Sequence, residues 1–196
     1  MTAPLDATQS NPKQGGASFP LRHRLLRLAW SIVWGTLGKW TPAPFHGWRR
    51  FLIRLFGAKL HPTAKVYPGV SIWYPPNLTM GPYSCLAPGV YCYCMAEIRL
   101  EAYALVSQRA HLCAGTHDID DPHFQLYVRP IHLGENAWVA AEAFVGPGRT
   151  IGDRAVLGAR AVLFKDLPAD AVAIGNPANI IRQRRLPKQP GGTTTC

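Results

Sequence analysis

Four histidines lie close together near the middle of the chain, and imidazole is the side chain best suited to moving protons near neutral pH. They are His111, His117, His123 and His132. His117 stands in the sequence Ala-Gly-Thr-His-Asp, and three carboxylates follow it at Asp118, Asp120 and Asp121. A neutral imidazole could take the proton from a hydroxyl group that attacks a carbonyl carbon. Histidines are also ligands for zinc. The cluster therefore indicates acid–base chemistry or a metal site.

A repeat of six residues flanks this cluster on both sides. After it, an aliphatic residue recurs at every sixth position, and a small residue often follows one and four positions later. The aliphatic positions are Leu133, Val139, Val145, Ile151, Leu157 and Leu163. The small residues are Gly134, Ala140, Gly146, Gly152 and Gly158, then Ala137, Ala143, Ala155 and Ala161, with Arg149 as the exception. Before the cluster the same spacing appears at Met80, Leu86 and Cys92 and, after a shift of two, at Leu100, Val106 and Leu112.

A spacing of six fits neither one face of a helix nor one long strand. A short strand followed by a turn satisfies it, because positions i and i+4 then point inward and the small residue after the aliphatic one tolerates the tight corner. Three such units make one triangular coil, and stacked coils bury the aliphatic column. Leu112 and Leu133 are 21 residues apart, which is not a multiple of six. We therefore expect residues 114–132 to leave the lattice as a loop that carries the site.

The N-terminal half of the chain is strongly basic. Residues 1–96 hold ten Lys and Arg against one acid, Asp6, whereas residues 97–196 hold eleven basic and ten acidic residues. Such a surface can face an anionic membrane, nucleic acid or water. No stacking platform or nucleic-acid motif accompanies the charge, so nucleic acid is not expected.

Residues 19–58 read as a basic amphipathic helical segment. Two helices, "LRHRLLRLAWSIVWGTLGKW" and "FHGWRRFLIRLFGAKL", are separated by the prolines of "TPAP". In the second helix, Phe51, Leu52, Leu55 and Phe56 share one face, and Arg49, Arg50 and Arg54 lie on others. Either the apolar faces pack against the protein, or residues 20–57 rest on a membrane surface with four tryptophans at the headgroups. These tryptophans are Trp30, Trp34, Trp40 and Trp48.

The remaining segments set the organisation of the chain. The 196 residues suit one all-β domain, residues 59–186, with the helical appendage and a short C-terminal extension. Residues 1–18 and 187–196 have the composition of disordered tails. The longest uncharged stretch in the N-terminal region, Leu28–Gly38, is shorter than the roughly 20 residues that cross a bilayer. Five cysteines without a C-x-x-C pair, and no cleavable signal, predict free thiols and a cytoplasmic protein.

Several segments resemble a known family. The repeat and the closing "AIGNPANIIRQR" are similar to the hexapeptide-repeat acyltransferases, which form a left-handed parallel β-helix and usually a homotrimer. Across residues 45–185 the similarity is greatest to exopolysaccharide O-acetyltransferases of the colanic-acid type. It rests on "GWRRFLIRLFGAKL", "YPPNLTMG", "LCAGTHDIDDPHF" and "WVAAEAFVGPGRTIGDRAVLGARAVLFKDLP". The resemblance implies transfer of an acetyl group from acetyl-CoA to a hydroxyl of a saccharide or lipid-linked saccharide, without a metal.

The resemblance also implies roles for single residues. His117 would be the general base. Ala141 and Ala159 would contact the pantetheine arm through their backbone, although small side chains also fit coil corners, and Lys165 and Arg182 would lie near the coenzyme phosphates. Asp118 and Tyr93 are the residues we assign to the acceptor. The chain departs from the family pattern at Phe164 and Asn179, and it has tyrosines and cysteines in "VYCYCMAE" where related sugar acetyltransferases place an asparagine.

Three alternatives stay open at this point. Left-handed β-helix carbonic anhydrases bind a metal with three histidines at a trimer interface, and His111, His117 and His123 could supply such ligands. The chain could also be a scaffold without catalysis that docks on a membrane through its helices. Finally, the aspartates after His117 could only form turns, because Asp is common there and Asp121 precedes Pro122.

Overall fold

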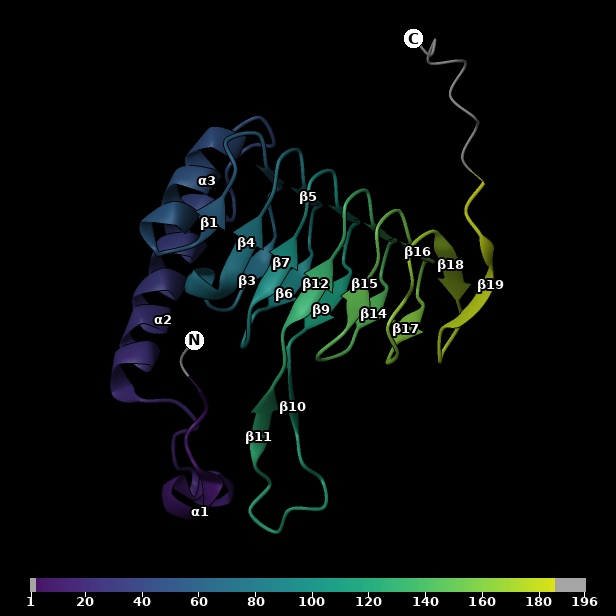
Figure 1. Ribbon diagram of the computed structural model, residues 1–196. Coiled ribbons are helices and arrows are strands. Elements are labelled where there is room, and N and C mark those ends of the chain that lie inside the picture. Colours follow the sequence, from purple (N-terminus) through teal and green to yellow (C-terminus); the bar gives the residue numbers. More distant parts are fainter. Residues whose placement is uncertain (1–2, 186–196) are drawn as a thin grey trace, which may run out of the picture.

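The chain winds into a three-sided prism of short parallel strands, with helices at its N-terminal end (Figure 1). The computed structural model describes residues 3–185. Sheet A contains β1 (Lys59–Leu60), β4 (Leu78–Met80), β7 (Ile98–Leu100), β12 (Ile131–Leu133) and β15 (Thr150–Ile151). Sheet C contains β3 (Ser71–Ile72), β6 (Tyr91–Tyr93), β9 (His111–Cys113), β14 (Phe144–Val145) and β17 (Val162–Leu163).

Sheet B forms the third side and extends furthest along the prism. It contains β2 (Lys65–Val66), β5 (Cys85–Leu86), β8 (Leu105–Val106), β13 (Trp138–Val139), β16 (Val156–Leu157) and β18 (Ala171–Ile174), and it ends with β19 (Asn179–Gln183). Each coil adds one strand to each sheet, so neighbouring strands are parallel, and only β19 runs antiparallel to β18. The expected β-helix of hexapeptide repeats is thereby confirmed.

The core is the column of side chains that the six-residue spacing predicts. The aliphatic residues from Leu133 to Leu163 are at most 2% exposed, and the alanines four positions later are fully buried. The glycines that directly follow the aliphatic residues are needed because the next coil packs closely against their Cα atoms. A Cβ atom on Gly152 would lie 2.5 Å from the backbone nitrogen of Ala169, which no real side chain can do. Small residues therefore set how closely the coils stack.

One edge of the prism, the corner between sheets C and A, carries the insertions. The short 3-10 helix Pro75–Asn77 lies at this corner after the first coil. After the third coil the chain leaves the prism as an antiparallel hairpin of β10 (Gly115–His117) and β11 (Leu126–Val128), with His117 paired to Leu126. We expected a loop over residues 114–132. The excursion is there, but it is a paired ribbon whose backbone hydrogen bonds hold its two arms in register.

The helix α2 (Leu21–Val33), a π-helical turn (Trp34–Gly38) and α3 (His46–Leu55) cover the first coil. Trp30 and Trp34 are buried, and their indole N–H groups donate to the carbonyl oxygens of Ile72 and Val70 at 2.7 and 2.8 Å. These two tryptophans anchor the helix to the prism. The expectation that they lie at a headgroup level is wrong for them.

The buried face of α3 also differs from the expected one. Arg49, Leu52 and Ile53 point inward, whereas Phe51 and Leu55 are 55% and 67% exposed. The reason is that the Arg49 guanidinium donates to the carbonyl oxygens of Thr41, Pro42, Ala43 and Val66, so a charged side chain closes the turn between the helices. The carbonyls of Thr41 and Ala43 have no other donor among the described residues, whereas that of Pro42 also accepts from the Phe45 N–H and that of Val66 lies 2.9 Å from Nδ1 of His46.

The N-terminal segment was expected to be a disordered tail, but residues 3–18 carry the short helix α1 (Ala7–Ser10) and a 3-10 turn (Pro12–Gln14). They pack against the tip of the hairpin (Figure 1). The Ala7 N–H donates to Oε1 of Gln125 at 2.7 Å, and the Lys13 ammonium donates to the Pro122 carbonyl at 2.7 Å. The other expected tail, residues 187–196, lies outside the described residues.

Two further expectations concern thiols and membrane spans. Cys85, Cys92, Cys94 and Cys113 are free thiols. Among residues 3–185, none of the helices has the length and apolarity needed to cross a bilayer.

Candidate active site

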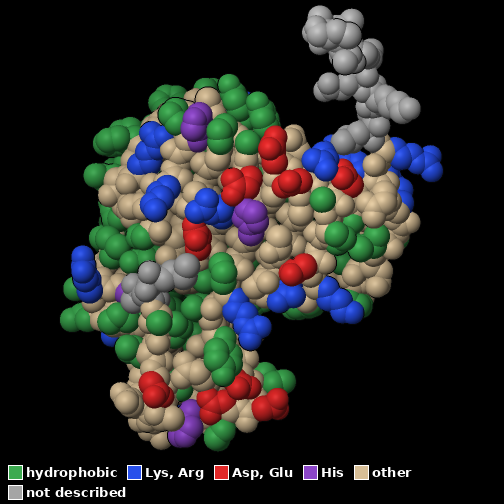
Figure 2. Space-filling model, in the orientation of Figure 1, with side chains coloured by type: hydrophobic (Ala, Val, Ile, Leu, Met, Phe, Trp, Pro, Cys, Tyr) green, Lys and Arg blue, Asp and Glu red, His purple; other side chains and the backbone are tan. Residues whose placement is uncertain are grey.

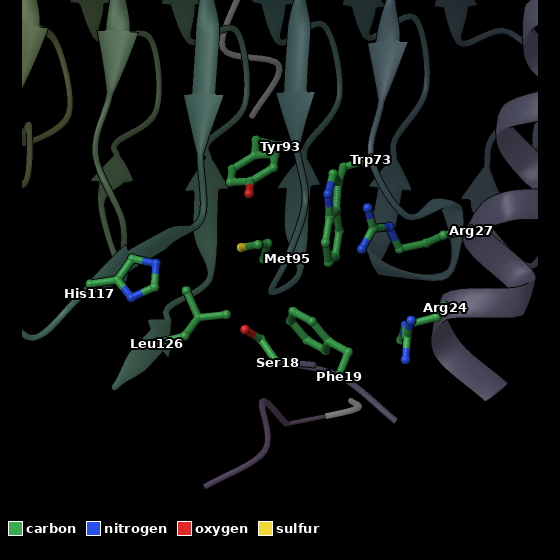
Figure 3. Close-up of a pocket in the computed structure, with 9 residues that line it drawn as sticks. All are labelled: Ser18, Phe19, Arg24, Arg27, Trp73, Tyr93, Met95, His117 and Leu126. Carbon is green, nitrogen blue, oxygen red and sulfur yellow. The ribbon is translucent and has the colours of Figure 1, made fainter. Parts of the chain in front are cut away.

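A cavity of about 310 Å³ lies at the base of the hairpin (Figure 3). Its size is at the lower end of the range of small-molecule sites. Three parts of the chain wall it, and they supply His117 and Leu126 from the hairpin, Trp73, Tyr93 and Met95 from the coils, and Phe19, Arg24 and Arg27 from the N-terminal region. The hairpin therefore does what an insertion in a repeat fold is expected to do, since it encloses a site beside an otherwise flat sheet.

His117 is the last residue of β10, and its ring is held in one orientation. Its Nδ1 lies 2.9 Å from the carbonyl oxygen of Phe124, and its ring stacks on the Phe124 ring with centroids 4.2 Å apart. A carbonyl oxygen can only accept a hydrogen bond, so in the neutral ring the proton sits on Nδ1. Nε2 then carries the lone pair. The hairpin thus presents an imidazole as a proton acceptor, as a general base requires.

Tyr93 lines the same cavity from the end of β6, and its hydroxyl points into the space between the labelled side chains (Figure 3). Burial raises the pKa of the Tyr93 phenol, so it stays protonated at neutral pH and can donate a hydrogen bond. Its ring packs edge-on against Trp73 at 5.5 Å. Phenol and indole together offer a polar donor and an apolar face, which are the two features that a sugar ring uses in binding.

The aspartates after His117 shape the tip of the hairpin. Asp118 accepts hydrogen bonds from the Asp120 N–H at 3.1 Å and from the Tyr127 hydroxyl at 3.3 Å, and it does not line the cavity. The Asp121 carboxylate accepts from the N–H groups of His123 and Gln125, which lowers its pKa. These contacts support the turn interpretation of the aspartates, and an acceptor contact by Asp118 stays a prediction.

The residues predicted to bind the coenzyme lie on two different edges. Ala141 and Ala159 occupy the same turn between sheets B and C one coil apart, and the Arg160 N–H donates to the Ala141 carbonyl at 2.9 Å. Lys165 follows β17 at the corner between sheets C and A, the edge that also carries the hairpin. Within one chain the two alanines are therefore separated from His117 by the width of sheet C.

The C-terminal end of the prism holds a second cavity, of about 210 Å³, where Lys165 meets Asn179 and Ile180. Arg182 stands exposed on β19 and donates to the Gln183 carbonyl. Phe164, which departs from the family pattern, is 58% exposed next to Lys165. Lys165 and Asn179 thus come together, whereas Arg182 does not line this cavity.

The other histidines have different surroundings. His132 Nε2 lies 3.0 Å from the Glu101 carboxylate, and His111 lies among aromatic rings on sheet C, where burial lowers its pKa. Within residues 3–185, no group of three or more His, Cys, Asp or Glu is placed to hold a metal ion. His111, His117 and His123 therefore do not form a ligand set in the chain.

Two charged residues of the cavity, Arg24 and Arg27, were not predicted from the sequence to belong to the site. The guanidinium of Arg27 lies 3.9 Å above the centre of the Trp73 ring. The available signal was that α2 contains no acidic residue, so its arginines have no partner on their own helix. Nothing in the sequence showed that two of these arginines face the coil that carries Trp73.

The fold is that of a class of enzyme, the hexapeptide-repeat acetyltransferases. A maltose O-acetyltransferase from Clostridium difficile 630 superposes with a TM-score of 0.75 at 23% identity, over 92% of this chain and all of that one. A hexapeptide-repeat acetyltransferase from Vibrio cholerae, solved with acetyl-CoA, also gives 0.75, at 21% identity over 92% of this chain. At these identities the likeness concerns the fold.

A closer sequence relative places the chain within this class. The proposed colanic acid biosynthesis acetyltransferase WcaF of Escherichia coli K12 is 44% identical over 155 residues, which cover 79% of this chain and 85% of WcaF. No family model matches the chain. The chain therefore belongs to the WcaF family of hexapeptide-repeat acetyltransferases and is an acetyltransferase.

Proposed function

We propose that this acetyltransferase moves the acetyl group of acetyl-CoA to a hydroxyl group of a saccharide acceptor, in exopolysaccharide biosynthesis, with His117 as the general base. The observation that carries the proposal is the imidazole of His117, fixed by Phe124 with its Nε2 free, on the wall of a cavity shared with Tyr93 and Trp73. The name of WcaF and the acetyl-CoA in the Vibrio cholerae structure support the choice of acceptor and donor.

Three residues of the cavity, His117, Tyr93 and Trp73, have a task in this reaction. Acetyl-CoA supplies a thioester carbonyl that an alcohol can attack. Nε2 of His117 takes the proton of the attacking hydroxyl, and the Phe124 carbonyl stabilises the imidazolium through the Nδ1–H. The acyl C–S bond then breaks, and the imidazolium returns the proton to the departing thiolate, so that coenzyme A leaves as the thiol. The Tyr93 phenol donates a hydrogen bond to the acceptor, and the Trp73 ring supports the apolar face of the sugar. The role of Asp118 would be indirect, through Tyr127 and the shape of the hairpin tip.

The coenzyme requires a second chain in this proposal. The small side chains of Ala141 and Ala159 leave the backbone of one edge open to a pantetheine arm, and Lys165 and Arg182 bring positive charge to the C-terminal end for its phosphates. Ala141 and Ala159 lie across sheet C from the hairpin of their own chain. We therefore place the active site between neighbouring chains of a homotrimer, where the hairpin of one chain meets the alanine edge of the next.

We further propose that the helices hold the enzyme on the inner face of the membrane, where a lipid-linked acceptor would reside. Leu21, Leu25, Leu28 and Ile32 share one face of α2 and are each more than half exposed. Trp48, Phe51 and Leu55 form a similar exposed face on α3. Hydrophobic side chains gather along the margin formed by these helices (Figure 2). An apolar face on a basic segment is the signature of an interfacial helix.

The first experiment is calorimetric titration of acetyl-CoA into the protein, followed by coenzyme A release with candidate sugars, for the wild type and for His117→Ala. We expect turnover to fall by roughly 100- to 10,000-fold, with coenzyme affinity unchanged, because only the proton acceptor is lost. His123→Ala is the matched control, since His123 lies on the same hairpin and does not line the cavity. Unchanged turnover in His117→Ala would refute the general-base role.

A further inference from the structure

We infer that the acceptor carries an oxyanion, a phosphate or a carboxylate, and that Arg27 together with Arg24 binds it. The inference rests on the proposed function, because it assigns the acceptor of the same cavity. The two arginines come from α2 and lie across the cavity from His117 (Figure 3). A charged sugar bound between the arginines and His117 would present a hydroxyl group to the imidazole and its negative charge to the arginines of α2.

The charge of these arginines has no counterpart within the described residues. Neither Arg24 nor Arg27 makes a side-chain hydrogen bond or an ion pair anywhere in residues 3–185. By contrast, Arg49, Arg50 and Arg54 all donate to backbone carbonyls, as structural arginines do. A cavity wall with two guanidinium groups and no anion is complementary to an anionic ligand.

The environment of Arg27 favours an anion over water. Its side chain is half-buried, and burial lowers the pKa of its guanidinium, so the charge has lost part of its hydration without gaining an ion pair. The central carbon of the guanidinium lies over the Trp73 ring, 3.9 Å from its centre, and this contact uses none of the N–H groups as a hydrogen-bond donor to oxygen. The N–H groups at its edge stay available, and they match the two oxygens of a phosphate or carboxylate.

The acidic side chains near the cavity do not pair with Arg24 or Arg27, because they are bound to other groups. Asp118, the acidic residue next to His117, binds the Asp120 N–H and the Tyr127 hydroxyl at the hairpin. Glu97, which follows Met95 by two residues, pairs with Arg99. The anion must therefore come from a ligand, and its place beside the base identifies that ligand as the acceptor.

The test is titration of inorganic pyrophosphate, glucose 1-phosphate, glucuronate and glucose into the whole protein, without acetyl-CoA. We expect saturable binding of the charged compounds, at least tenfold tighter than that of glucose, and loss of this preference in Arg24→Gln/Arg27→Gln. Arg22→Gln is the control, because it removes a positive charge from the same helix at a residue that does not line this cavity. Glucose 1-phosphate and glucuronate distinguish a phosphorylated acceptor from a uronic acid.

Three outcomes would overturn the inference. The first is equal affinity for glucose and the charged compounds, and the second is a preference that survives in Arg24→Gln/Arg27→Gln. The third is competition between saturating coenzyme A and pyrophosphate, since it would assign the arginines to the donor instead. Because these titrations need no turnover, they stay decisive if no acetyl transfer is found, and that failure would count against the proposed function alone.

Discussion

At the scale of single residues, the same side chain does different work according to its surroundings. Arg49 is fully buried and bound to four carbonyl groups, whereas Arg27 is half-buried and bound to none. The histidines differ in the same way. The Phe124 carbonyl orients His117, and Glu101 partners His132, whereas both ring nitrogens of His23 are buried without a partner.

His23 predicts a loss of stability in mild acid. Its ring stacks on Phe19 and Tyr74, and burial lowers its pKa from 6.5 to about 4, with a smaller contribution from the Arg27 charge. The unfolded chain therefore binds more protons between pH 6.5 and 4, and stability falls as the pH drops through this window. We expect a loss of roughly 2–3 kcal/mol over this window, because a pKa shift of this size corresponds to a free energy of that order.

The measurement is urea unfolding of the wild type and of His23→Phe at several pH values. His23→Phe keeps the aromatic stack but cannot titrate, so its stability should fall less over the window. Parallel curves for the two proteins would contradict the assignment.

At the scale of elements, one edge of the prism carries the hairpin and the N-terminal end carries the helices. The hairpin brings His117 to the cavity, and α2 brings Arg24 and Arg27. Residues 3–18 pack on the hairpin tip through Gln125, so the N-terminal segment supports the element that holds the base. The position of α2 depends in turn on the buried Trp30 and Trp34, the second of which follows the helix directly, and on the turn that Arg49 closes.

Arg49→Met tests this turn. The methionine fills much of the space but removes the guanidinium donor from four carbonyl oxygens and leaves those of Thr41 and Ala43 without a donor, so we expect a loss of roughly 2–4 kcal/mol in unfolding free energy. Arg22→Met, at an exposed site on α2, should cost less than about 0.5 kcal/mol. Equal stabilities by urea denaturation would show that the buried guanidinium is dispensable.

At the scale of the whole molecule, the proposed site belongs to two chains and the proposed membrane contact to the outer faces of α2 and α3. Both proposals are based on surfaces of the single chain that lack a partner for their proposed role. The alanine edge lies away from the base, and the apolar stripe from Leu21 to Ile32 has nothing packed on it within the described residues.

Mixed trimers test the shared site. His117→Ala and Ala159→Trp should each be inactive alone, the second because indole fills the space proposed for the pantetheine arm. When the two are co-expressed, sites that pair an intact hairpin with an intact alanine edge should restore about a quarter of wild-type activity by random assortment in a cyclic trimer. Coenzyme A release is the readout. A mixture as inactive as its parents would place the site within one chain.

Vesicle co-sedimentation tests the membrane contact. Leu25→Ser/Leu28→Ser/Ile32→Ser should reduce binding to phosphatidylglycerol vesicles by more than tenfold, because it removes most of the exposed stripe of α2. Tyr83→Ser/Tyr103→Ser, an exposed aromatic pair on the prism, is the control and should sediment like the wild type. Charge reversal at Arg49, Arg50 or Arg54 would be a poor test, since these arginines hold backbone carbonyls.

The amino-acid sequence by itself determined the prism, because the six-residue spacing from Leu133 to Leu163 is local and each coil repeats the same burial. It also determined the place of the hairpin, since Leu112 and Leu133 are out of step. Only the tertiary structure decided which faces of α2 and α3 are buried, that Arg24 and Arg27 line the same cavity as His117, and that Ala141 lies on another edge. These facts depend on contacts between segments that are distant in sequence. The periodicity within one segment does not determine which other segment packs against it.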